Sequence, residues 1–409
     1  MERIKRDNYL SILKNFKDQQ IIKVITGIRR CGKSTLLEIY KDYLKEEGIN
    51  DNQIISINFE DAYYEELQDR KKLYDYLKEK LVIGKKTYIF LDEIQMVKEF
   101  EKTVDSLFIN KDVDLYITGS NAYLLSSELA TLLTGRYIEI KMLPLSFKEY
   151  VSAFEDKTDL SRKFRDYLRY SSFPQAIELF KANPDNITLF LDGIYNTILF
   201  KDVMQRKGIT DKNTLEKVTK YLYDNIGNRT SINSISDNLA GLEKNNSYNT
   251  ISLYVQSLID SFMIYKANRY DIKGKEFLKT QEKYYAVDIG LRYYMLGQSA
   301  GKDMGHILEN IVYLELLRRG YEVYIGKFDD LEVDFVAKNS KNTYYYQVAL
   351  TTREASTDNS PVLDRELAPL KKINDNYSKY ILTLDDDLEA DYDGIKKINV
   401  IDWLLDDNQ

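Results

Sequence analysis

The stretch VITGIRRCGKSTLL, residues 24–37, decides the fold of the first part of this chain. Its segment GIRRCGKS, residues 27–34, fits the pattern G-x-x-x-x-G-K-[ST] at every defined position. An apolar run, residues 21–26, comes before it, and a helical pattern follows from Lys33 to about residue 44, so the loop joins a strand to a helix. Gly27 and Gly32 let the backbone wrap closely, so that successive N–H groups and the helix N-terminus face one anion. The sequence therefore predicts a phosphate-binding loop.

The side chains of this loop suit a nucleoside triphosphate, so we expect ATP and Mg²⁺ as cofactors. Lys33 places an ammonium on the β- and γ-phosphates, and Ser34 offers its hydroxyl to Mg²⁺. The residues predicted to contact the nucleotide are Gly27, Arg29, Arg30, Cys31, Gly32, Lys33, Ser34 and Thr35. Cys31 lies next to a helix N-terminus and two arginines, a setting that lowers a thiol pKa. We therefore expect Cys31 to be reactive and ATP to protect it; the alternative is a small side chain at a permissive loop position.

Three later segments supply candidate catalytic groups. The strand pattern IFL, residues 89–91, ends in Asp92 and Glu93. Asp92 is expected to hold Mg²⁺ together with Ser34, and Glu93 to polarise the attacking water. A further strand, residues 115–118, ends near Ser120 and Asn121, either of which is a candidate for touching the γ-phosphate or that water; a plain turn is the alternative. Arg136 follows a turn and is a candidate arginine finger, with a surface arginine as the alternative.

The spacing of these segments predicts an α/β fold. Strand patterns at residues 21–26, 53–59, 88–91 and 115–118 alternate with helical patterns. Such alternation is typical of a parallel sheet sandwiched by helices. From residue 147 to about 296 the pattern is mostly helical, and a mixed α/β pattern resumes at residue 305.

Composition limits the function classes. At 409 residues, with 44% hydrophobic and 30% charged residues, the chain is a multidomain globular protein. One cysteine excludes an intramolecular disulfide or a cysteine-clustered zinc site, and one histidine excludes a histidine-rich metal site. A net charge of −7 argues against a globally basic nucleic-acid binder. Because no apolar run reaches the roughly 18 residues that span a bilayer, and the N-terminus is charged, we expect a cytoplasmic protein with no membrane partner.

Taken together, these segments resemble a family of bacterial and archaeal AAA-type ATPases that join an N-terminal P-loop domain to a C-terminal domain of unknown function, DUF4143. The matching stretches include VITGIRRCGKSTLL, IFLDEIQ, YITGSNAYLLS, LPLSFKEY, SSFPQAIE and ILENIVYLELLRRGYEVYIGK. Ser171 and Ser172 stand where many relatives carry two glycines. The resemblance implies a P-loop AAA-type domain at 1–145, a helical lid or linker at 146–200, a winged-helix-like domain at 201–300 and a DUF4143 domain similar to PD-(D/E)XK nucleases at 301–409.

The middle segment fits a helix-turn-helix with a wing. Helical patterns at 232–239 and 247–259 precede strand patterns at 262–270 and 283–287. The expected wing carries Lys266, Arg269, Lys273, Lys275, Lys279 and Lys283, a set that can contact phosphates. The would-be recognition helix starts SYNTISLY, residues 247–254, without a lysine or arginine. DNA binding and packing between domains or against a protein both remain open.

The nuclease-like resemblance implies a metal site at Glu309, Asp334 and Gln347. A PD-(D/E)XK site needs two or three carboxylates for Mg²⁺ and a lysine that orients water. Here Gln347 replaces a carboxylate and Ala349 replaces the lysine, although Lys371 or Arg365 can migrate into that role. His306, one turn before Glu309, is expected to cap or pack. We therefore expect a degenerate site that does not cleave nucleic acid.

The leading hypothesis is an ATP-hydrolysing AAA-type switch or motor with recognition domains, able to form a homo-oligomer. One alternative is an ATP-regulated DNA nuclease. Another is a nucleotide-binding interaction scaffold with low turnover.

Overall fold

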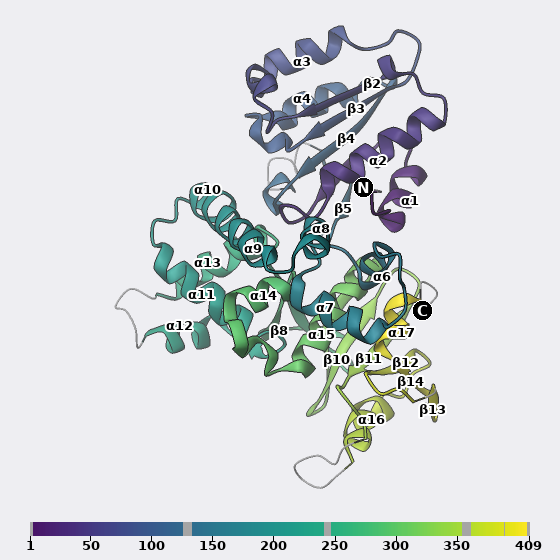
Figure 1. The fold of residues 1–409 in the computed structure, drawn as a ribbon, viewed down its shortest axis with the longest axis vertical. Helices are drawn as coiled ribbons and strands as arrows, with labels where there is room; N and C mark the ends of the chain where they lie inside the picture. The colour runs from purple at the N-terminus through teal and green to yellow at the C-terminus, as the bar shows by residue number, and fades with distance from the viewer. Residues whose placement is uncertain (1–2, 126–132, 241–246, 354–360, 388, 407–409) are drawn as a thin grey trace. The chain divides into compact units, whose positions relative to one another are not determined.

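The computed structural model describes residues 3–125, 133–240, 247–353, 361–387 and 389–406. The chain divides into two compact units (Figure 1): an N-terminal unit, residues 1–144 with 260–262, and a C-terminal unit, residues 145–259 with 263–409. The first division agrees to within a residue with the boundary expected at 145. The boundaries expected at 200 and 300 do not separate compact units, because continuous helix from Asn186 to Lys207 crosses residue 200 and one sheet contains strands from both sides of residue 300.

A five-stranded parallel sheet in the order β2-β3-β4-β1-β5 forms the N-terminal unit. Its strands are β1 (Ile22–Thr26), β2 (Ile54–Asn58), β3 (Thr87–Asp92), β4 (Val113–Gly119) and β5 (Tyr137–Lys141). Its α-helices are α1 (Asp7–Asn15), α2 (Lys33–Glu46), α3 (Arg70–Glu79) and α4 (Phe100–Phe108), which flank the sheet (Figure 1). Strands β1, β3 and β4 are buried along their whole length, as their apolar runs require in a sheet covered on both faces. The predicted helix-flanked parallel sheet is confirmed.

One buried ion pair joins β1 to β4 near their amino ends. Lys23 and Asp114 are both fully buried and in contact. The hydroxyl of Tyr116 and the backbone N–H of Asp18 each donate to Asp114 at 2.9 Å. Burial lowers the pKa of Lys23 and raises the pKa of Asp114, against their mutual attraction. Because a buried charge without a partner is costly, this pair disfavours any other register of the two strands.

The C-terminal unit starts with helices and ends with a large sheet. Its α-helices are α6 (Phe147–Ser152), α7 (Leu160–Tyr170), α8 (Pro174–Ala182), α9 (Asn186–Thr197), α10 (Gln205–Lys207), α11 (Lys212–Asp224), α12 (Ile232–Ala240), α13 (Tyr248–Asp260), α14 (Ile289–Leu296), α15 (Met304–Arg318), α16 (Val362–Lys372) and α17 (Val400–Leu405), with a π-helical turn, Ile198–Met204, before α10. Its strands are β6 (Arg229–Thr230), β7 (Ile264–Asp271), β8 (Glu276–Ala286), β9 (Glu322–Phe328), β10 (Leu331–Lys338), β11 (Thr343–Val348), β12 (Ser378–Thr383), β13 (Ala390–Tyr392) and β14 (Ile395–Asn399).

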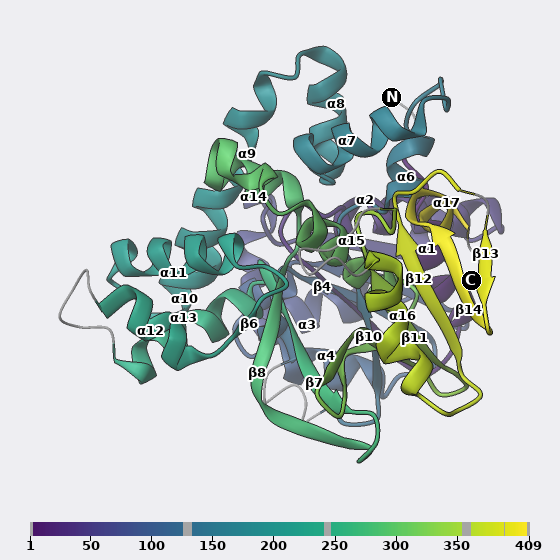
Figure 2. The same ribbon diagram turned by 90° about the horizontal axis from the view of Figure 1, so that it is seen from below.

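These nine strands form a single mixed sheet in the order β13-β14-β12-β11-β10-β9-β7-β8-β6. The hairpin β7–β8, expected to be a wing, joins the later strands through parallel pairing of β7 with β9, where Arg269 lies opposite Ile325. Figure 2 shows the hairpin continuing the row of later strands. The order α11, β6, α12, α13, β7, β8, with β6 paired to β8, keeps the predicted helix-turn-helix and hairpin in sequence. The expected wing is thus an integral part of the sheet.

The turn between α7 and α8 has a residue in a conformation that favours glycine. Ser171 ends α7 with φ 87° and ψ 150°, a region that costs a non-glycine residue about 1–3 kcal/mol. The turn is held close to α14: a Cβ added to Gly290 would lie 2.3 Å from the backbone nitrogen of Ser171. Next to it, Ser172 donates its N–H and its hydroxyl to the buried Asp288 at 2.7 and 2.6 Å. The two serines therefore have opposite effects on stability.

Replacing Ser171 with glycine should stabilise the chain. Relief of the backbone conformation outweighs the loss of the Ser171 side-chain hydrogen bonds, and we expect a gain of about 1 kcal/mol in the free energy of unfolding. Urea denaturation measures the change. The control, Ser172→Gly, should lose about 1 kcal/mol or more, because it removes a hydroxyl donor from a buried carboxylate. Equal destabilisation by both changes would contradict the strain at Ser171.

Candidate functional site

The predicted phosphate loop lies between β1 and α2, as its sequence indicated. Gly27 has φ 153°, and a Cβ at this position would lie 2.2 Å from the carbonyl oxygen of Met142. Gly32 has φ 105° and forms the N-cap of α2. Both glycines are therefore required by backbone geometry. The loop therefore ends at the N-terminus of a helix, the position at which backbone N–H groups bind anions.

The Lys33 side chain is folded back onto the loop. Its ammonium donates to the carbonyl oxygens of Gly27 at 3.0 Å and Ile28 at 3.3 Å. It also lies 3.5 Å from Glu93 Oε1. Only 4% of Lys33 is exposed. The positive charge thus lies in the mouth of the loop, opposite the acid expected to activate water.

Asp92 and Glu93 stand at the carboxyl end of β3, next to β4. The Thr118 hydroxyl donates to Asp92 and accepts the backbone N–H of Glu93 at 3.0 Å, so one side chain of β4 positions both acids. The Ser34 side chain also hydrogen-bonds to Asp92. Ser34 and Asp92, the two predicted Mg²⁺ ligands, therefore lie together. Glu93 has φ 55°, a strained value for a non-glycine residue that is often found at functional sites.

The two acids differ in their pKa directions. Burial raises the pKa of Asp92, and the hydrogen bonds from Ser34 and Thr118 only partly oppose it. Burial acts to raise the pKa of Glu93 as well, but the Lys33 ammonium, the Gln95 amide and Arg29 together outweigh it and lower that pKa. Glu93 is thus held ionised, as a residue that accepts or orients a proton of water must be.

Two buried amides near the ends of β3 and β4 have polar atoms without a partner. Asn121 is 1% exposed, and neither its Oδ1 nor its Nδ2 has a hydrogen-bond partner among the described residues. The Oε1 of Gln95 is also buried and unsatisfied. Leaving a buried amide unpaired costs about 1–3 kcal/mol, so such groups call for a ligand or a water molecule. The sequence did not single out Gln95 or Thr118; their positions after β3 and at the end of β4 were the available signal.

This set of residues fits a nucleoside triphosphate with Mg²⁺. The glycine backbone, the Lys33 ammonium and the helix N-terminus suit phosphate oxygens, and Ser34 with Asp92 supplies the oxygen ligands that Mg²⁺ prefers. The unsatisfied amide of Asn121 adds a polar group for a phosphate or water. Of the other predicted contacts, Arg29 pairs with Glu60 at 2.6 Å, while Arg30 and Thr35 are exposed.

Arg136 lies at the opposite edge of the sheet. Its carbonyl accepts the N–H of Ile22 at 2.8 Å, at the amino end of β1, whereas the phosphate loop follows the carboxyl end. A five-residue strand spans about 16 Å, farther than an arginine side chain reaches. The guanidinium pairs with Asp105 and lies 5.6 Å from the centre of the Phe108 ring. A role for Arg136 on this chain's own nucleotide is therefore excluded, which leaves a role in a neighbouring copy or a structural one.

The expectation of a reactive Cys31 is wrong. The side chain is completely buried, and burial raises the pKa of the thiol against the opposing effects of Lys33 and Arg6. Arg6 holds the loop from inside: its guanidinium donates to the carbonyl oxygens of Cys31 at 3.0 Å and of Leu143 at 2.7 Å. Cys31 can offer a phosphate its backbone, but its sulfur faces the interior, a direction that a loop motif does not reveal.

Comparison with known proteins agrees with this geometry. Residues 19–151 match the family model of an AAA domain. An uncharacterized protein of Haemophilus influenzae is 41% identical over 408 residues, which cover 98% of this chain and 98% of its own. The chain belongs to the same family. Another uncharacterized protein, from Methanocaldococcus jannaschii, is 30% identical over 399 residues, covering 93% of this chain and 85% of its own length.

A solved structure shares the fold. A Walker-type ATPase of Pyrococcus abyssi aligns with a TM-score of 0.52 at 12% identity, covering 72% of this chain and 96% of its own. The N-terminal unit is an AAA-type P-loop domain. The expected DUF4143 domain is not shown: residues 161–302 match a different domain of unknown function, DUF8612. The DUF8612 match begins within α7 and ends before α15 and strands β9, β10 and β11. Those later elements hold several of the stretches on which the DUF4143 resemblance depended.

The predicted nuclease-like residues do come together in the C-terminal unit. Glu309 on α15 and Asp334 on β10 interact electrostatically. The amide of Gln347 accepts the N–H of Asp334 at 3.0 Å and donates to Glu366 at 2.9 Å. His306 packs its ring against Gly227. No group of three His, Cys, Asp or Glu within the described ranges is placed to hold a metal ion, so these residues in their present positions do not fit the Mg²⁺ that the resemblance implies.

A different lysine, from an unexpected part of the chain, approaches these carboxylates. Arg365 pairs with Glu366 at 2.8 Å and Lys371 with Asp393 at 4.0 Å, so neither takes the expected role. Instead, Lys283 on β8 lies 2.9 Å from Glu309. The sequence placed Lys283 on a DNA-contacting wing, but the joining of that hairpin to the sheet buries it.

Two of the other wing cations are paired within the protein. Lys273 lies 3.0 Å from Asp329 and Lys266 lies 3.9 Å from Glu282. Arg269 is only 8% exposed. The side chain of Lys279 lies outside the described residues. Pairing reduces the charge available to phosphates, which weakens the expected DNA contact at this hairpin.

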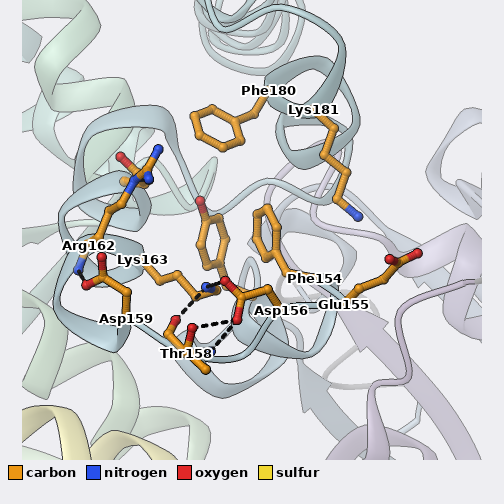
Figure 3. Close-up of a pocket in the computed structure, with 11 residues that line it drawn as sticks. Phe154, Glu155, Asp156, Thr158, Asp159, Arg162, Lys163, Phe180 and Lys181 are labelled. Atoms are coloured by element: carbon orange, nitrogen blue, oxygen red, sulfur yellow. Dashed lines mark hydrogen bonds and ion pairs between the residues drawn. The ribbon is translucent and has the colours of Figure 1, made fainter.

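A separate cavity of about 640 Å³ lies among α6, α7 and α8 (Figure 3). Its wall combines aromatic rings with charged groups that bond to one another: Lys163 donates to the Thr158 carbonyl at 2.6 Å, and Asp156 accepts the Thr158 N–H at 2.8 Å. Lys181 lies 5.0 Å from the centre of the Phe154 ring. These pairings do not assemble a nucleophile with a base, so the phosphate loop remains the candidate site.

No helix in the described ranges is long and apolar enough to cross a membrane.

Cys31 should resist alkylation in the folded protein. Because the thiol is buried and its pKa is raised, we expect iodoacetamide at neutral pH to modify it at least about tenfold more slowly than in urea-unfolded chain. As Cys31 is the only cysteine, intact mass reports the reaction directly. Equally fast modification of folded and unfolded protein would contradict the buried orientation.

Proposed function

We propose that this protein binds and hydrolyses ATP with Mg²⁺ and works as an AAA-type switch or motor. The observation that carries the proposal is the convergence of Lys33, Asp92, Glu93 and the unsatisfied Asn121 at one edge of the sheet. ATP supplies the phosphoryl group, and Mg²⁺ neutralises its charge.

In this proposal each side chain of the site has a separate role. Lys33 leaves the carbonyl oxygens of Gly27 and Ile28 for phosphate oxygens, which releases Glu93 from its ion pair. Ser34 and Asp92 hold Mg²⁺. Glu93 orients the attacking water and accepts its proton, and Asn121 holds that water or the terminal phosphate.

The C-terminal unit is the recognition part of this proposal. Its order of helices and hairpin is compatible with the expected winged helix, and Glu309 on α15, Asp334 on β10 and Gln347 on β11 are the nuclease-like residues. Because Lys266 and Lys273 are paired within the chain and Lys283 is buried, a protein partner is favoured over DNA. Purification of a Glu93→Gln variant held in the ATP state, followed by identification of the protein or DNA that co-purifies, distinguishes these two kinds of partner. The nuclease and low-turnover scaffold alternatives predict DNA cleavage or negligible turnover, respectively.

Two substitutions separate binding from turnover. Lys33→Ala should abolish measurable ATP binding, because it removes the charge that faces the phosphates. Glu93→Gln should keep binding and lose turnover. Nucleotide titration and phosphate release measure both, and Lys45→Ala, at an exposed position on the same helix, is the control. Wild-type affinity in Lys33→Ala would refute the site.

Substitution of Arg136 tests whether neighbouring copies of the chain complete one another's sites. If it completes the site of a neighbouring copy, Arg136→Ala lowers turnover about 10³-fold with unchanged ATP affinity, and specific activity rises with protein concentration. Asp105→Ala breaks the same ion pair but keeps the guanidinium, so it should preserve turnover. Equal losses in both variants would assign Arg136 a structural role instead.

A further inference from the structure

Lys283 lies among three carboxylates in the C-terminal unit, of which Glu309 is buried and Glu332 and Asp334 are half-buried. Its ammonium is 2.9 Å from Glu309 Oε1 and 2.9 Å from Glu332 Oε1. The Tyr285 hydroxyl donates to the same oxygen of Glu309 at 2.5 Å. Only 6% of the Lys283 side chain is exposed. The acids come from α15 and β10, whereas the lysine comes from β8.

The electrostatics show how strongly the cation is held. Burial alone would lower the pKa of Lys283, but Glu309, Asp334 and Glu332 outweigh burial and raise it. Burial and Glu309 raise the pKa of Asp334, while Lys283 opposes them. Buried carboxylates close together need a positive charge between them. In this cluster, Lys283 supplies it.

Several other polar groups of the cluster are bonded within the protein. Asp334 Oδ2 accepts the N–H of Val348 at 2.8 Å. The oxygen of the Gln347 amide accepts the N–H of Asp334, and its nitrogen donates to Glu366. Arg229 pairs with Glu332 from the exposed side. A divalent cation would have to displace an ammonium that is already bonded to two carboxylates.

We propose that Lys283 is the resident cation of this cluster and occupies the place of a divalent metal ion. The native cluster then binds no Mg²⁺ or Mn²⁺, because its carboxylates are not placed to hold a metal ion in their present positions. Removal of Lys283 frees Glu309, Glu332 and Asp334 to close around such an ion, so they form a latent metal site. The inference is independent of ATP hydrolysis, since it concerns the C-terminal unit alone.

The test is Mn²⁺ binding to the full chain without nucleotide, followed by electron paramagnetic resonance and thermal unfolding. Lys283→Ala should gain a Mn²⁺ ion at least about tenfold more tightly bound than any in the wild type, with a rise in Tm on adding Mn²⁺. Lys283→Arg keeps the positive charge and should gain nothing. Lys283→Ala/Glu309→Gln should lose the new ion, because it lacks one carboxylate ligand.

Wild-type Mn²⁺ binding that Asp334→Asn abolishes would overturn the proposal, whatever the variants at residue 283 do. A folded Lys283→Ala chain that gains no Mn²⁺ would overturn it too. If Lys283→Ala does not fold without metal, refolding with Mn²⁺ should rescue it. Failure of that rescue, when Lys283→Ala/Glu309→Gln folds, counts against the latent site.

Discussion

The candidate site depends on the parallel pairing of β1, β3 and β4. Parallel strands end at the same edge of a sheet, so the phosphate loop after β1, the acids at the end of β3 and Asn121 after β4 meet although they are far apart in sequence. Thr118 makes the connection specific, because its hydroxyl bonds to both Asp92 and the backbone of Glu93. A slip of β3 against β4 would separate these groups. The buried contact between Lys23 and Asp114 opposes a slip of β1 against the same strand.

In both units a buried lysine neutralises a buried acid. In the N-terminal unit Lys23 neutralises Asp114, and in the C-terminal unit Lys283 neutralises Glu309 and Glu332. In each case the lysine and its acid partners lie on different elements, so the ion pair forms only when those elements dock. Such pairs contribute little net stability but strongly penalise alternative packing, since a lone buried charge costs about 3–5 kcal/mol.

The hairpin β7–β8 shows how tertiary pairing changes the role of a segment. Its pattern of strands and lysines resembles a wing that would contact phosphates. Pairing of β7 with β9 extends the sheet across residue 300, buries Lys283 and pairs Lys273 with Asp329. The segment thereby joins helices α12 and α13 to the later strands. One continuous sheet also explains why the expected division at 300 does not bound a compact unit.

The sequence by itself determined the features that depend on neighbouring residues. The glycines and Lys33 of the loop, the acids after an apolar strand and the alternation of strands with helices all follow from local patterns, and the structure places them as predicted. It did not determine which way Cys31 points, where the partner of Arg136 lies, or that Lys283 pairs with Glu309. These facts depend on contacts with Arg6, Asp105 and Glu309, from 25 to 31 positions away along the chain. A local pattern encodes backbone conformation and chemical type, whereas the surroundings of a side chain are decided only when distant elements pack together.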